Sequence, residues 1–85
     1  MNIMVTLVNV KKSNNLIVAD YFLESNNYDK GHLEYDVEKK QVIKYSYSKE
    51  DADSTIKYGL SKATKAIEKL IEFNKFPETY RYIWY

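Results

Sequence analysis

The chain of 85 residues contains no cysteine, one proline and two glycines. Without cysteine there is no disulfide, no thiolate nucleophile and no cysteine-ligated zinc. The scarcity of proline and glycine argues against a low-complexity segment, and 45% apolar residues is typical of an ordinary folded domain. The length suits one domain and is too short for two, so we expect residues 1–85 to form a single domain.

The sequence also has no excess of charge and no long apolar run. Thirteen basic residues stand against twelve acidic ones, so the whole-chain charge does not favour nucleic acid or anionic lipid. The longest apolar runs, such as residues 16–19, fall far short of the roughly 20 residues that a bilayer span needs. Residues 1–7 lack the basic and apolar regions of a secretory signal. We therefore expect a cytoplasmic protein without membrane association.

Hydrophobic periodicity predicts four strands in the first half of the chain. Residues 3–10 and 16–23 are apolar and β-branched on either side of a polar break, which indicates a β-hairpin. Alternating apolar and polar residues then mark strands over 32–37 and 43–47, with a turn at 38–41 between them. The simplest connection of these strands is an antiparallel meander.

After the fourth strand the apolar spacing changes from two to 3.6, which predicts one amphipathic helix over about residues 52–74. Its start has two interpretations. Ser48 with Asp51 forms a possible capping box, whereas Asp53 or Ser54 would cap a shorter helix.

The end of the chain completes the predicted fold. Gly59 within the helix costs about 1 kcal/mol relative to Ala, and we expect it to allow close approach of the helix to the sheet. Pro77 stops the helix, and the aromatic and β-branched residues 79–85 predict a fifth strand. The sequence thus predicts an α+β fold in the order ββββαβ, with the helix packed on one sheet face.

One helix covers only one face of a sheet, yet the first, second and fifth predicted strands carry apolar residues on both faces. An uncovered apolar surface of several hundred Å² usually marks an interaction site. Tyr, Trp and Arg, which are favoured at interface hot spots, concentrate in residues 80–85. We therefore predict a protein interface, in its simplest form a twofold homodimer. The predicted interface residues are Tyr80, Tyr82, Trp84 and Tyr85, supported by Met4, Val8, Ile17 and Tyr21.

Two points about this interface stay open. The first, second and fifth predicted strands could instead form the centre of the sheet and pack in the ordinary way, with only their aromatic edges exposed to solvent. A register change of one residue would also exchange the two faces, so either alternation of a strand could point outward.

Catalytic and cofactor chemistry has little support. His32, the only histidine, shares a strand face with Glu34 and Asp36. Successive residues on one face of a strand lie about 7 Å apart, so these three are too far apart to hold one ion without other ligands. No Gly-x-Ser-x-Gly elbow, Walker motif or dinucleotide motif is present. We expect a solvated polar face there, with no catalytic residue, no metal and no cofactor.

Two alternative functions use other features. The predicted helix carries Lys57, Lys62, Lys65 and Lys69, which with exposed tyrosines could bind nucleic acid, although Glu68 and Glu72 interrupt the row. The frequent Asn, Lys, Ile and Tyr are typical of low-GC bacteria and their mobile elements. This composition does not indicate a function. The second alternative is an inhibitor encoded by a phage or mobile element that binds a host protein, which would use the same interaction chemistry as the predicted interface and differ only in the partner.

Overall fold

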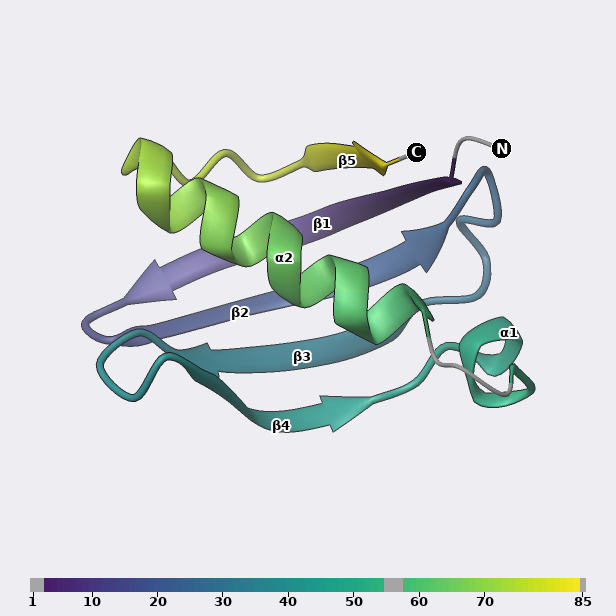
Figure 1. The fold of residues 1–85 in the computed structure, drawn as a ribbon, viewed down its shortest axis with the longest axis horizontal. Coiled ribbons are helices and arrows are strands. Elements are labelled where there is room, and N and C mark those ends of the chain that lie inside the picture. The colour runs from purple at the N-terminus through teal and green to yellow at the C-terminus, as the bar shows by residue number, and fades with distance from the viewer. Residues whose placement is uncertain (1–2, 55–57, 85) are drawn as a thin grey trace.

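The computed structural model describes residues 3–54 and 58–84, which form two layers (Figure 1). One layer is a five-stranded antiparallel sheet, and one long helix crosses a single face of it. The predicted α+β fold of four strands, a helix and a fifth strand is confirmed. The elements are β1 (Ile3–Ser13), β2 (Leu16–Leu23), β3 (Gly31–Asp36), β4 (Gln41–Ser46), α1 (Lys49–Ala52), α2 (Tyr58–Phe73) and β5 (Tyr80–Trp84).

The sheet has the strand order β4-β3-β2-β1-β5. The first four strands form the predicted meander, and β5 returns to pair antiparallel with β1, opposite β2. The register places Met4 opposite Ile83 and Leu7 opposite Tyr80. The N-terminal strand therefore lies inside the sheet, and the C-terminal strand forms one of its edges.

β1 is longer than the predicted strand and contains an irregularity. It continues to Ser13, which pairs with Leu16 across a tight turn. The register shifts between Val8 and Lys11, and Asn9 in this bulge has φ 55°. Asn tolerates the left-handed region better than most residues, which suits it to this position.

The prediction of one continuous helix from about residue 52 is wrong at its start. Ser48 caps the separate short helix α1, and its hydroxyl accepts a hydrogen bond from the Asp51 amide at 3.1 Å. The Asp51 carboxylate does not close a capping box. It accepts hydrogen bonds from the backbone N–H groups of Gly59 and Leu60, both at 2.9 Å. Asp51 therefore satisfies amides in the first turn of α2 from outside that helix.

Tyr21 lies in a buried polar cluster that joins the sheet to both helices. Its hydroxyl donates to Asp51 at 2.6 Å and accepts from the Ser48 amide at 3.3 Å. Burial, followed by the hydrogen bond to Asp51, raises the pKa of Tyr21 well above its usual range. A Cβ at Gly59 would lie 2.8 Å from one edge of the ring, and a Cβ at Gly31 would overlap the other edge. The expected close approach at Gly59 is confirmed.

The hydrophobic core lies between α2 and the sheet. The buried side of the helix begins with the small residues Gly59, Ala63 and Ala66 and ends with the larger Ile67 and Leu70. The small residues let the helix backbone come near the strands. The sheet contributes odd-numbered residues from β2 and β3, as expected for side chains that alternate between faces. The core residues are Val5, Leu7, Val10, Ile17, Ala19, Tyr21, Leu23, Leu33, Tyr35, Ala63, Ala66, Ile67 and Leu70.

Candidate interaction surface

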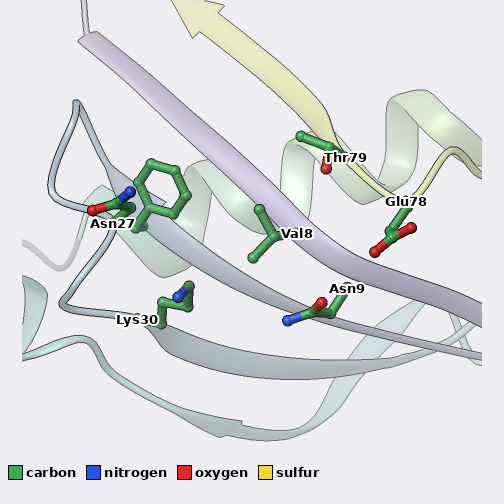
Figure 2. A pocket seen from close by; sticks show the side chains of 7 residues that line it. Val8, Asn9, Asn27, Lys30, Glu78 and Thr79 are labelled. Atoms are coloured by element: carbon green, nitrogen blue, oxygen red, sulfur yellow. The ribbon is translucent and has the colours of Figure 1, made fainter.

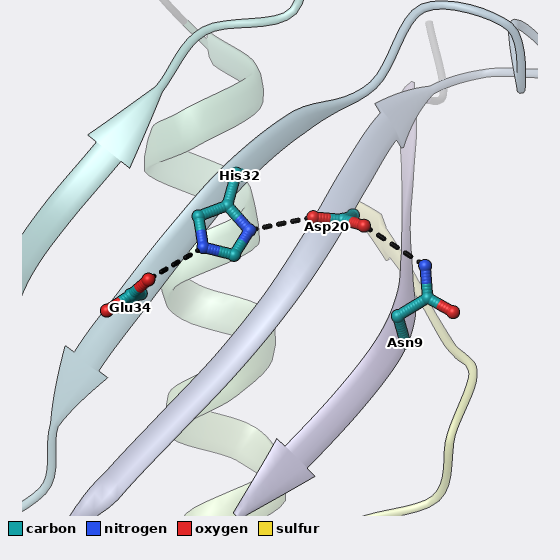
Figure 3. Close-up of polar contacts among 4 residues, drawn as sticks. All are labelled: Asn9, Asp20, His32 and Glu34. Atoms are coloured by element: carbon teal, nitrogen blue, oxygen red, sulfur yellow. Dashed lines mark hydrogen bonds and ion pairs between the residues drawn. The ribbon is translucent and has the colours of Figure 1, made fainter.

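The sheet face opposite α2 is uncovered in the part of the chain that the structure describes, and we call it the open face (Figures 2 and 3). Its apolar residues gather where β5, β1 and β2 lie side by side. Met4, Val8 and Phe22 are half-buried, and Ile83 is 50% exposed. We call these four residues the apolar patch.

Thr6 shows how closely packed the centre of the open face is. It lies opposite Phe22 on one side and Arg81 on the other. Although no helix covers this face, Thr6 is only 4% exposed. Neighbouring side chains already exclude water from part of the open face, so a docking partner would meet a partly desolvated surface.

Two adjoining hollows border the apolar patch. One has a volume of about 380 Å³, and Val8, Phe22, Asn27 and Lys30 contribute to its lining (Figure 2). The other, of about 330 Å³, shares Val8, Phe22 and Asn27 and extends to Arg81. Both open to solvent, and their mixture of apolar and polar walls suits side chains of a protein partner better than an enclosed small ligand.

A polar row crosses the open face next to the apolar patch (Figure 3). The Asn9 amide donates to Asp20 at 3.0 Å. His32 Nδ1 lies 2.7 Å from the other oxygen of Asp20, and His32 Nε2 lies 2.9 Å from Glu34. Lys44 is directly opposite Glu34 in the register of β4. The row therefore links β1, β2 and β3 through side chains.

The row shifts the titration of two of its members. The hydrogen bond to Glu34 raises the pKa of His32 above its ordinary value, against the opposing effect of burial, and Asp20 adds to the increase. Burial alone would raise the pKa of Asp20, but hydrogen bonds from His32 and Asn9 outweigh it and hold that pKa below its ordinary value. Both shifts favour a charged imidazolium facing two carboxylates.

The acidic partners of His32 differ from those considered in the sequence. Asp20 joins His32 and Glu34, whereas Asp36 accepts a hydrogen bond from the Lys39 amide in the following turn, at 2.9 Å. Within residues 3–54 and 58–84, no three His, Cys, Asp or Glu side chains are arranged to hold a metal ion. The three convergent groups form a charged hydrogen-bonded row instead.

The predicted interface residues do not lie on one face. Met4 and Val8 belong to the apolar patch. The expectation that Ile17 and Tyr21 support an exposed surface is wrong, because both are fully buried beneath α2. Tyr80 and Tyr82 pack against the core on the same side as α2. The side chain of Trp84 and the whole of Tyr85 lie outside the described residues.

Phe22, Ile83, Arg81 and Asp20 also lie on the open face and were not predicted there. A usable signal was present. Asp20 is the only charged residue in the run 16–23, and a charged side chain is rarely buried without a partner. Its position marks the even-numbered side of β2 as the solvent side, which assigns Phe22 to that side as well.

The lysines of the nucleic-acid alternative lie on or near α2. Lys65 and Lys69 are exposed, and Lys62 is half-buried. Lys69 forms an ion pair with Glu72 at 3.6 Å. Lys57 lies outside the described residues. The described lysines therefore share their helix with acidic groups, as expected for an ordinary solvated surface.

Comparison of the chain with protein-family models, curated proteins and solved structures finds no match. Among the described elements, no helix is both long and apolar enough to pass through a bilayer.

Proposed function

We propose that this chain is a non-enzymatic, cytoplasmic protein-interaction module that self-associates through the open face. The main support is the apolar patch, which remains accessible although α2 covers the other face. Uncovered apolar surface next to polar groups is characteristic of interaction sites. The buried parts of Met4, Val8 and Phe22 hold these side chains in place, so little conformational entropy is lost when a partner binds.

A second copy of the chain suits the open face in area and in charge. The sheet lies roughly in the plane of the two longer extents of the molecule, 32 and 22 Å (Figure 1). These extents bound a face of about 700 Å², close to the roughly 800 Å² that each partner buries in an interface of standard size. Acidic Asp20 and Glu34 share the face with basic Lys44 and Arg81. A face of mixed sign can meet its own copy without large repulsion.

Replacing Ile83 with Lys tests the proposed dimer. Full burial of an exposed isoleucine is worth about 1.5–3 kcal/mol. Because Ile83 is 50% exposed, about half of this remains to be gained, and a twofold interface loses that contact twice. We therefore expect Ile83→Lys to weaken dimerisation at least about 10-fold. The measurement is the absolute mass by light scattering after size exclusion, over a concentration series at low and high salt.

Phe73→Lys is the matched control, because Phe73 is 54% exposed, close to the 50% of Ile83, but lies at the end of α2, on the other side of the sheet. Its dimerisation should equal that of the wild type. Equal weakening by both variants would remove the open face as the interface. A wild-type monomer at every concentration would overturn self-association and favour capture of a different protein, such as the host target of an inhibitor.

Nucleic-acid binding through Lys62, Lys65 and Lys69 is the less supported alternative. It requires retention on single-stranded DNA or RNA that falls steeply as salt increases. The pairing of Lys69 with Glu72 reduces the positive charge available for phosphate. A response that does not change with salt would reject this alternative.

A further inference from the structure

We propose that His32 makes the open face sensitive to pH: the protonated imidazole bridges Asp20 and Glu34 and favours association, and loss of its proton weakens association. This inference rests on the proposed function, because it concerns regulation of the same face. It is carried by the placement of one imidazole between two carboxylates beside the apolar patch (Figure 3).

Both ring nitrogens of His32 face carboxylate oxygens, at 2.7 Å for Asp20 and 2.9 Å for Glu34. An imidazolium has an N–H on each nitrogen and donates to both oxygens. A neutral imidazole has only one N–H, so its other nitrogen would direct a lone pair at a carboxylate. Deprotonation therefore removes one charge-assisted hydrogen bond and creates a repulsive contact in its place.

The charged groups around His32 come from three strands. Asp20 lies on β2 and is held by Asn9 of β1. Glu34 lies on β3 with His32 itself, and Lys30 just before β3 is close enough to influence Asp20.

On the β4 side, Ser46 is opposite His32 and Lys44 is opposite Glu34. Deprotonation of His32 changes the charge of the row by one unit.

The row is adjacent to the apolar patch. Val8 is opposite Asp20 on one side of β2, and His32 is opposite Asp20 on the other. In a dimer of open faces, the rows of both copies lie within or beside the interface. Loss of the His32 proton removes the positive charge between Asp20 and Glu34 and makes the row of each copy more negative by one unit, and like charges brought together at an interface disfavour association.

The direction of the pH effect on folding follows from the same contacts. The pKa of His32 is raised in the folded state, so its contribution to stability is fully present below its ordinary value of 6.5 and is lost as pH rises through the raised value. The pKa of Asp20 is lowered, so its contribution is present above 3.8 and is lost as pH falls through the lowered value. Increasing pH through the raised pKa of His32 should therefore weaken the row.

The test compares the wild type with His32→Gln, a neutral variant that does not titrate. The His32 ring resonances are followed by NMR against pH in dilute samples, and the dimer dissociation constant is measured by sedimentation from about pH 6 to about pH 9. We expect His32 to titrate above its ordinary value and the wild-type dimer to weaken on the order of tenfold over this range, because each copy loses one charge-assisted hydrogen bond in the row. The dissociation constant of His32→Gln should change little, and this variant also controls for the terminal amine.

Each contrary outcome has a distinct meaning. Titration of His32 at or below its ordinary value would overturn the charged bridge. A wild-type dimer whose dissociation constant has the same pH profile as that of His32→Gln would overturn the regulation but leave the dimer intact. Absence of a dimer at every pH would overturn the proposed self-association and this regulation together, while the NMR titration would still report whether the bridge exists.

Discussion

Asp51→Ala is expected to lower the free energy of unfolding by about 3–5 kcal/mol, because it leaves several buried donors without an acceptor. The carboxylate accepts from the Tyr21 hydroxyl and from the amides of Gly59 and Leu60. Each unsatisfied buried group costs about 1–3 kcal/mol, and contributions within one cluster are not fully additive. Denaturant unfolding followed by circular dichroism measures the loss.

Two further variants test the assignment. Tyr21→Phe removes one hydroxyl from the cluster and should cost about 1–2 kcal/mol. Asp53→Ala removes a carboxylate that is exposed in the same region and should leave stability within about 0.5 kcal/mol of the wild type. An Asp51→Ala protein as stable as Asp53→Ala would show that water or other groups can replace the carboxylate.

Gly31→Ala is expected to destabilise the fold by about 3 kcal/mol, at the upper end of the usual cost of overpacking. A Cβ at this position would overlap the Tyr21 ring and would lie 2.7 Å from the Ser48 amide nitrogen. The ring is held on its far side by Gly59 and through its hydroxyl by Asp51, so it cannot move aside without breaking the buried cluster. Thermal or denaturant unfolding measures the effect.

Gly59→Ala is expected to destabilise the fold as well, although Ala in a helix is usually about 1 kcal/mol more favourable than Gly. Here the added Cβ would lie 2.8 Å from the Tyr21 ring and 3.0 Å from the Asp51 carboxyl carbon, so we expect a loss. Lys30→Ala, an exposed neighbour of Gly31, should change stability little. A gain in stability for Gly59→Ala would show that the ring moves aside easily.

The strands and the helix were largely predictable, because they depend on local periodicity. Residues 16–23 alternate between core and solvent along their whole length, and the predicted strand coincides with β2. The interruption before α2 was not predictable from periodicity, since Ala52 continues the helical spacing of the apolar residues. The helix start depends on where the Asp51 carboxylate lies, and that position depends on Tyr21, which is 30 residues away in the sequence.

The candidate surface was predicted only in outline. Apolar residues on both sides of β1 and β2 correctly indicated that one helix would leave apolar surface uncovered. The assignment of Ile17 and Tyr21 to that surface was wrong, because two alternating apolar sets in one strand look alike when only hydrophobicity is considered. Asp20 distinguishes them, because a lone charge in an apolar strand avoids the core. Its partner His32 comes from the neighbouring strand, and this pairing follows from the register.

The sequence by itself determined the α+β class, the order of the elements and the excess of apolar residues over what one helix can cover. These follow from the repeat lengths of strands and helices and from composition, which are local properties. Only the tertiary structure decided which alternation faces α2, where that helix begins and which carboxylates meet His32. Burial, buried hydrogen bonds and strand register join residues distant along the chain, and their energies depend on the whole packed fold.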